Sequence, residues 1–478
     1  MGWFGRRNRD AERNGHPARG QDEHREVDTV RLRPAHSDNG HSSNGHSDNG
    51  RSDNGHGGSN GHRPTTIAVE GRLPVATGTF RVPVPRSEPE PDAELAELAA
   101  LDERLRRARP HNIGFPGATD FDYTALAPFF AHHLLNNVGD PFVDGAGTNH
   151  TKEHERYVVG VVADLLRAPA DDRWGYVTAG GSEGNLYALH IARSLHPNAV
   201  VYHSAAAHYS VQTAVQLLGL PACQIGVDAA GRMDYDDLAR QVAANGERPA
   251  IVVATIGTTM TEAVDDVRVI AHVVGTGPSS GRFIHADAAL AGLPLAMCDP
   301  QTRPGMDFAD GADSVTISGH KFLGSPIPCG VVITLNRHRG QAPEVDYTAS
   351  PNSTLGCSRS GHAPLILWYA LRRLGIDGLR RRAEESRRLA RHLIAALQRV
   401  GWPAYRHEHA FTVVLRTPPP AVTEKWVLAS SNGWSHIVCM PGVTQGQLDA
   451  FVADLDAAAH GSAPTATGAA ARPVLTAP

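Results

Sequence analysis

The sequence predicts an α/β fold with a mostly parallel sheet, followed by a smaller α+β domain toward the C-terminus. Between Trp174 and Leu335, short apolar runs alternate with helical patterns, as they do where parallel strands are joined by covering helices. After Pro364, a long helical pattern precedes two strand-like runs and another helix, an order typical of an α+β unit. The chain has 478 residues, of which 41% are hydrophobic, so it can bury the cores of both domains.

The beginning of the chain is predicted to be a disordered tail over residues 1–80. From His36 onward the unit His-Ser-Asp-Asn-Gly repeats with small changes, and such a segment buries too little to offset the entropy of ordering itself. Its histidines could hold a transition metal loosely, but a solvated tail is the favoured interpretation and no metal site is predicted. Residues 81–150 are predicted to be an N-terminal segment with a helical pattern over 92–109.

The large domain is predicted over residues 151–345 and the small domain over 346–460. In the large domain we expect strands at 175–178, 199–203, 250–256, 283–286, 314–318 and 330–335, with helices at 183–194, 210–218 and 235–243. In the small domain we expect helices at 364–399 and 445–458 and strands at 411–416 and 435–440. Residues 461–478 are predicted to be a second disordered tail.

A lysine and an aspartate follow two of the predicted strands. Lys321 stands in Ser-Gly-His-Lys after one apolar run, and Asp287 stands in His-Ala-Asp-Ala-Ala after another. A lysine amine becomes a good nucleophile at neutral pH when burial or a nearby cation lowers its pKa. Pyridoxal 5'-phosphate (PLP) requires both residue types, since a lysine forms a Schiff base with its aldehyde and a carboxylate pairs with its ring nitrogen. The pair therefore predicts PLP as the cofactor.

A phosphate cradle is predicted where Gly-Gly-Ser-Glu-Gly-Asn (residues 180–185) joins a strand to a helix. Backbone N–H groups and the helix dipole can bind an anion there, which makes Gly181 and Ser182 candidate phosphate ligands. Ser318, three residues before the lysine, and His320, directly before it, are further candidate phosphate ligands.

Two other strand ends carry candidate side chains. His208 follows the predicted strand at 199–203, and its imidazole could stack on the cofactor ring. Thr258 and Thr259 follow the strand at 250–256, and their hydroxyls could reach the ring or the substrate.

The same glycine-rich turn also matches the Gly-x-Ser-x-Gly elbow of α/β-hydrolases. Asp287 and His320 follow Ser182 in the order of a serine–aspartate–histidine triad. A serine hydrolase is thus an alternative, but it leaves Lys321 unexplained.

Composition excludes several other classes. The formal net charge is −5, which offers no basic face for nucleic acid. No apolar run is long enough for a membrane span, and the N-terminus lacks the apolar core of a secretory signal. The five cysteines are far apart and are read as reduced thiols, so a cytoplasmic protein is expected.

These motifs closely resemble those of the group II PLP-dependent amino-acid decarboxylases. Within that group they are similar to the branch of bacterial histidine decarboxylases, which also holds plant serine decarboxylases and a valine decarboxylase. The resemblance covers about residues 112–457. It is carried by the segments 112–116, 120–123, 136–140, 174–178, 256–259, 285–289, 318–322, 324–330 and 361–364, of which the lysine motif at 318–322 is very specific. It implies a carboxy-lyase of the aspartate-aminotransferase fold (fold type I), a homodimer with the active site at the interface, and an amino acid as substrate.

The resemblance also implies roles for residues. Lys321 would be the Schiff-base lysine and Asp287 the partner of the ring nitrogen. His208 would stack on one face of the ring and Ala289 would support the other. Gly181, Ser182, Ser318 and His320 would bind phosphate. Tyr347, in Glu-Val-Asp-Tyr, would lie on a mobile loop that protonates the product carbon.

The substrate is the least determined part of the prediction. In the segment from Val143 to His150, the start and His150 resemble the plant serine enzymes more than the bacterial histidine enzymes. Gly147, however, stands where the plant sequences carry a tyrosine. A site without placed polar groups favours an apolar side chain. The sequence therefore favours valine or a similar aliphatic amino acid first, histidine second and serine third. Transamination or retro-aldol cleavage on the same fold is a further alternative.

Overall fold

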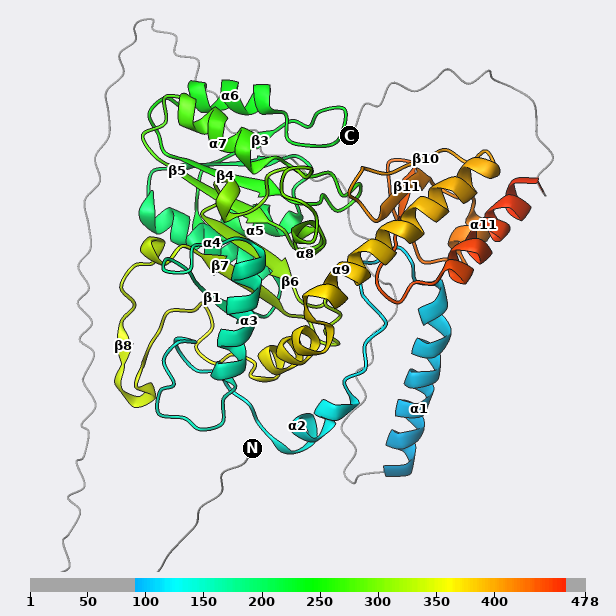
Figure 1. The fold of residues 1–478 in the computed structure, drawn as a ribbon, viewed down its shortest axis with the longest axis horizontal. Helices are drawn as coiled ribbons and strands as arrows, with labels where there is room; N and C mark the ends of the chain where they lie inside the picture. Colours follow the sequence, from blue (N-terminus) through cyan, green and yellow to red (C-terminus); the bar gives the residue numbers. More distant parts are fainter. Residues whose placement is uncertain (1–90, 461–478) are drawn as a thin grey trace, which may run out of the picture. The chain divides into compact units, whose positions relative to one another are not determined.

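The computed structural model describes residues 91–460 (Figure 1). The predicted tails at 1–80 and 461–478, with the histidine repeat, lie outside the described residues. Helix α1 (Pro91–Ala108) agrees with the predicted helical pattern, and all of its side chains are at least partly exposed.

The large domain is built on a seven-stranded sheet in the order β1-β7-β6-β5-β4-β2-β3. Strands β2 to β6 pair in parallel, and β7 runs antiparallel to both of its neighbours. The strands are β1 (Trp174–Thr178), β2 (Val200–Ser204), β3 (Ala222–Ile225), β4 (Ala250–Thr255), β5 (Arg282–Asp287), β6 (Ser314–Ser318) and β7 (Gly330–Thr334). The mostly parallel α/β prediction is confirmed.

Within this sheet, β3 is the one strand that was not predicted from the sequence. It lies at the edge of the sheet, where only Ile225 of its four residues is buried. An edge strand that is exposed on most of its length lacks the apolar run by which a buried parallel strand is recognised.

The two faces of the sheet carry separate hydrophobic cores. In β4, Val252 and Ala254 belong to one core, whereas Ile251 and Val253 belong to the other, because successive side chains of a strand point to opposite faces. Residues of α4 (Gly181–Leu195) and α5 (Tyr209–Leu218) contribute to the second core. Residues of α3 (Lys152–Leu165), α6 (Tyr235–Ala244), α7 (Val267–Thr276) and the first half of α9 (His362–Arg399) contribute to the first.

The C-terminal part contains a four-stranded antiparallel sheet in the order β10-β11-β13-β12. Its strands are β10 (Ala404–Tyr405), β11 (Thr412–Arg416), β12 (Ala429–Ser431) and β13 (Trp434–Val438), and the last helix is α11 (Gln445–His460). Figure 1 shows α9 running from the large domain into this part, where its second half packs beside the small sheet. The predicted helix is interrupted at Gly375, whose φ of 60° is a left-handed value that favours glycine.

Residues from the N-terminal segment complete the C-terminal core. Ile113 and Ala118 belong to the same hydrophobic cluster as α11 and β11. The Val438 N–H donates to Ile113 O at 2.9 Å, and the Gly114 N–H donates to Val427 O at 3.0 Å. These bonds place the segment around Gly114 beside the small sheet. Among the described residues, no helix combines the length and apolar character needed to span a membrane.

Candidate active site

A cavity of about 400 Å³ lies where strands of the large sheet end, facing the segment around Gly114 and the small sheet. Asp287 is the last residue of β5, and Ser318 is the last residue of β6. Gly181 and Ser182 follow the turn after β1 and begin α4. Carboxyl ends of parallel strands meet at one edge of a sheet, which explains why residues far apart in the sequence share this wall.

Eight predicted residues line the cavity: Lys321, Asp287, His208, Ala289, Gly181, Ser182, Ser318 and His320. Thr258 is placed differently. Its side chain is 3% exposed, and its Oγ1 bonds Thr261 Oγ1 at 2.8 Å and accepts the Ala263 N–H at 3.1 Å. Thr258 thus braces a turn, and the next residue, Thr259, lines the cavity instead.

Tyr347 is also placed apart from Lys321. Its side chain is 81% exposed, and it lines a separate cavity of about 180 Å³ together with Gly147, His150 and Lys152. The two segments expected near the substrate, around Gly147 and Tyr347, therefore meet each other, and neither meets Lys321 in the same copy of the chain.

Lys321 is the best placed amine in the protein. The chain has three lysines, and Lys321 is the one that lines the large cavity. Lys152 Nζ donates to the Val143 and Asp144 carbonyls, and Lys425 pairs with Asp454 at 2.7 Å. Burial lowers the pKa of Lys321 below its ordinary value, although Asp287 opposes this, so the amine is easier to deprotonate.

The glycine-rich turn leaves room and donors for an anion. A Cβ at Gly181 would lie 2.8 Å from Ser318 Oγ, so a side chain there would fill the space between the turn and β6. The first N–H groups of a helix have no partner within the helix, and α4 begins at Gly181. Glu183 turns back, accepting the Ala179 N–H at 2.8 Å and the Tyr176 hydroxyl at 2.9 Å, which keeps its carboxylate engaged with β1 and the turn.

Asp287 is held by two donors. The Asn185 side-chain amide donates to its Oδ2 at 2.8 Å, and the Ala289 N–H donates to its Oδ1 at 3.3 Å. Asp287 is 5% exposed, and a buried carboxylate favours a cationic partner. Asn185 was read from the sequence only as part of the cradle motif, and no role was predicted for it.

These residues fit PLP on the geometry of the site alone. A buried lysine, a buried carboxylate and a cradle at a helix N-terminus face one cavity, and they match the aldehyde, ring nitrogen and phosphate of this cofactor. The Thr255 hydroxyl in the cavity wall is buried and has no partner among the described residues, which is consistent with a polar group that binds there.

The serine-hydrolase alternative does not fit the geometry. His320 Nδ1 lies 2.9 Å from the Cys329 carbonyl, whereas Asp287 is bonded to Asn185 and Ala289. Because a triad needs the aspartate to bond the histidine, Ser182, His320 and Asp287 do not form one.

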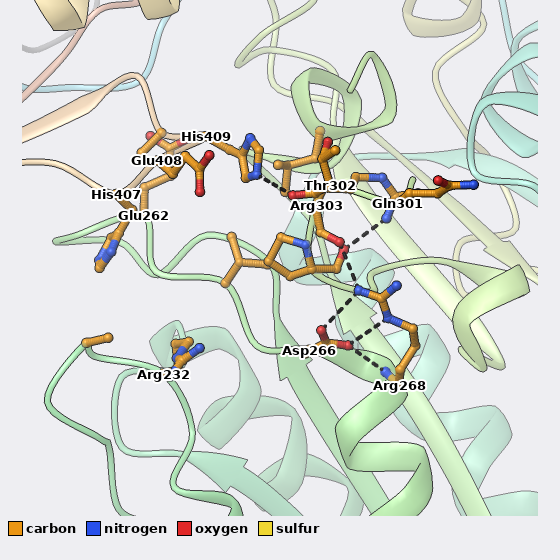
Figure 2. Close-up of a pocket in the computed structure, with 15 residues that line it drawn as sticks. Arg232, Glu262, Asp266, Arg268, Gln301, Thr302, Arg303, His407, Glu408 and His409 are labelled. Carbon is orange, nitrogen blue, oxygen red and sulfur yellow. Dashed lines mark hydrogen bonds and ion pairs between the residues drawn. The ribbon is translucent and has the colours of Figure 1, made fainter. Parts of the chain in front are cut away.

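A second large cavity, of about 370 Å³, contains none of the predicted site residues (Figure 2). Its arginines are already paired: Arg268 with Asp266 at 3.2 Å and Arg303 with Asp307 at 2.7 Å. Over residues 91–460, no group of three or more histidine, cysteine or acidic side chains is arranged to hold a metal ion.

Comparison with known proteins agrees with the geometry. The family model described as the pyridoxal-dependent decarboxylase conserved domain matches residues 119–401. A histidine decarboxylase of Mesorhizobium japonicum is 42% identical over 369 residues, which is 76% of this chain and 97% of that protein. Serine decarboxylase 2 of Oryza sativa subsp. japonica is 37% identical over 361 residues, covering 75% of this chain and 77% of that protein.

Solved structures show the same fold. L-methionine decarboxylase from Streptomyces sp.590, in its internal aldimine form, superposes with a TM-score of 0.70 at 28% identity. The superposition covers 78% of this chain and 97% of that chain.

Proposed function

The chain belongs to the pyridoxal-dependent decarboxylase family and is a PLP-dependent amino-acid decarboxylase, and we propose that its substrate carries an uncharged side chain. The charge of the cavity wall is the observation that supports this. Among the described residues that line the cavity, Asp287 is the only carboxylate and Lys321 the only lysine or arginine. Both are assigned to the cofactor, so within one copy of the chain a charged substrate side chain would be buried without a partner, which is costly.

In the proposed mechanism the cofactor stabilises the electrons released by the substrate, and the protein binds and positions the cofactor. Bound PLP supplies an electron sink for the pair of electrons left when the substrate loses carbon dioxide. Lys321 would hold the cofactor covalently through its amine, whose pKa is lowered by burial. Asp287 would accept a hydrogen bond from the ring nitrogen and so hold a proton on it.

The remaining residues of the cavity wall would bind the phosphate of the cofactor and orient its ring. The N-terminus of α4 at Gly181 and Ser182, together with Ser318 and His320, would bind the phosphate. His208 and Ala289, which line the same cavity, would support the ring.

We further propose that Tyr347 donates the proton to the product carbon in a homodimer. In one copy of the chain, Tyr347 and Gly147 line a cavity separate from that of Lys321. A second copy can supply this segment, and α1 offers an apolar face for association: Leu95, Leu98 and Leu105 are 64%, 60% and 54% exposed.

Three substrates stand first among uncharged amino acids. Histidine is supported by the 42% identity to a histidine decarboxylase over nearly all of that protein. Serine is supported by the 37% identity to a plant enzyme. Valine was favoured by Gly147 in the sequence, and the names of the relatives add no support for it. The similarity to a methionine decarboxylase at 28% identity favours an apolar side chain of some kind.

The deciding experiment incubates the purified protein and PLP with each common amino acid and identifies any amine by mass spectrometry. Histamine, ethanolamine or isobutylamine would identify histidine, serine or valine as the substrate. An amine from lysine, arginine or glutamate alone would contradict the uncharged side chain.

A further inference from the structure

Asn185 joins three polar side chains in the wall of the active-site cavity. Its Nδ2 donates to Asp287 Oδ2 at 2.8 Å and to Ser210 Oγ at 3.1 Å, and its Oδ1 lies 3.0 Å from His285 Nε2. Asn185 is 1% exposed, so water does not compete for these hydrogen bonds. Loss of these bonds would leave a buried amide without partners, which destabilises the folded state by the desolvation free energy of the amide.

The carboxylate of Asp287 fixes which way the amide points. A carboxylate only accepts hydrogen bonds, so the atom of Asn185 that faces Asp287 must be the NH₂ group. The amide oxygen then faces His285, and because that oxygen only accepts, His285 Nε2 must carry a proton. His285 Nδ1, 2.8 Å from Ser314 Oγ, accepts the serine hydroxyl. Burial lowers the pKa of His285 to about 4, in agreement with a neutral ring that has one N–H.

The hydrogen bonds of Asn185 also extend, through Ser210, to His208. Ser210 Oγ accepts from Asn185 and is 2.8 Å from His208 Nδ1, and the Ser210 backbone N–H donates to the same nitrogen at 3.2 Å. Nδ1 of His208 is therefore an acceptor. Burial lowers the pKa of His208, against the effect of nearby Asp287, so the ring is neutral and its proton is on Nε2.

We propose that Asn185 is a positioning residue that sets the orientation of the Asp287 carboxylate and, by donating to Ser210 Oγ, directs the Ser210 hydroxyl hydrogen toward His208 Nδ1. This second bond supports the Nε2–H tautomer of His208, which the Ser210 backbone N–H also favours. His285 and Ser314 belong to the same network of hydrogen bonds, and they hold the amide of Asn185 in the required orientation. One side chain thus aligns the group assigned to the ring nitrogen and the group assigned to the ring face. This inference rests on the proposed roles of Asp287 and His208.

The test compares Asn185→Ala with Asn185→Asp. Alanine removes both donors, and we expect kcat to fall about 10- to 100-fold at every pH, the usual effect of losing an orienting partner, with a smaller change in KM. Aspartate places a second carboxyl against Asp287, and such a pair shares one proton. When that proton is present, the introduced carboxyl can donate to Asp287 as the amide did, and when it is lost the two carboxylates repel.

The two variants should therefore differ in pH profile. The activity of Asn185→Asp relative to wild type should be greatest at about pH 5 and fall toward about pH 9 as the shared proton is lost, whereas that of Asn185→Ala should stay low throughout. The PLP dissociation constant and the visible absorption of the bound cofactor, measured over the same range, should change with pH in parallel for Asn185→Asp. Asn198→Asp, an exposed change just after α4, is the matched control and should match wild type.

The outcomes separate this inference from the proposed function. If Asn185→Ala retains kcat while Asp287→Asn loses it, the positioning role is wrong and the role of Asp287 stands. If both retain kcat, the proposed site itself is wrong. A pH-independent ratio for Asn185→Asp also contradicts the positioning role. Should Asn185→Ala fail to fold, Ser210→Ala replaces it and should alter kcat through His208 alone, without changing the PLP absorption that depends on Asp287.

Discussion

Arg359 and Glu155 form an ion pair beside the end of β1, and both side chains are almost fully buried, at 5% and 0% exposure. Glu155 also accepts the Val177 N–H at 2.9 Å and the Asn137 side-chain amide at 2.7 Å. Arg359 donates to Gly139 O at 3.1 Å. The pair therefore connects α3, the large sheet and the segment that leads to Gly147.

Removing Arg359 should destabilise the protein strongly. Arg359→Ala would leave the charge of Glu155 buried and unpaired, and we expect a loss of about 3–5 kcal/mol in the free energy of unfolding, measured by urea unfolding with tryptophan fluorescence. Arg380→Ala breaks an exposed pair with Asp377 (47% and 79% exposed), so it should change stability by less than about 1 kcal/mol. Equal losses for the two variants would contradict the importance of burial.

Lys321→Ala should abolish amine formation, because no other lysine lines the cavity. Borohydride reduction of the wild-type protein with PLP, followed by peptide mass spectrometry, should find the cofactor on the peptide of Lys321. Lys425→Ala, which changes a half-exposed residue paired with Asp454, should retain full activity. Cofactor trapped on Lys152 or Lys425 would show that the assignment is incorrect.

Asp287→Asn should lower kcat by about 100-fold or more, since an amide cannot hold a proton on the ring nitrogen as a carboxylate does. PLP should stay bound, because Lys321 and the cradle at Gly181 are unchanged, and its visible absorption reports this. Asp299→Asn, at an exposed turn, is the control. A rate close to wild type would remove Asp287 from the mechanism.

Glu262 should make stability depend on pH. Its carboxylate accepts the Phe411 and Thr412 N–H groups, and burial raises its pKa to about 7. Since the folded-state pKa lies above the unfolded value near 4.3, its contribution is present below about pH 4 and is lost as pH rises through 7.

Glu262→Gln stays uncharged and keeps an oxygen for both N–H groups. It should be about 1–3 kcal/mol more stable than wild type at about pH 8, and the difference should vanish near pH 4. Urea unfolding at both pH values measures this. Glu97→Gln, on the exposed face of α1, should show no such difference, and a pH-independent effect of Glu262→Gln would contradict the raised pKa.

Gly147→Tyr tests whether this position selects the substrate. A Cβ at Gly147 would meet only Asn149 Oδ1, at 3.5 Å, so the backbone accommodates a side chain. If a tyrosine supplies the polar wall of the plant serine enzymes, kcat/KM for serine should rise about 10-fold or more relative to valine and histidine. Thr348→Tyr, in the same small cavity, is the control for added bulk. An unchanged ratio would exclude Gly147 as a determinant of specificity.

The sequence by itself determined the sheet and the main chemical groups. Buried parallel strands such as β4 are continuous apolar runs, and ligands of parallel sheets bind where strands end. From these local rules the sequence predicts Lys321, Asp287 and the cradle at Gly181, and these residues line one cavity. They did not predict β3, which is an exposed edge strand, and they do not reveal that the Thr258 hydroxyl bonds within its own loop.

Only the tertiary structure decided how the site is assembled. Asn185 and Asp287 are 102 residues apart in the sequence, and His285 reaches Asn185 because β5 lies next to β6 and under α4. No periodicity encodes such a contact, since it depends on which strands pair and in which register. The same holds for Tyr347, which lies beside Gly147 and away from Lys321: the sequence supplies the side chains, and the packing of distant segments decides which of them share a cavity.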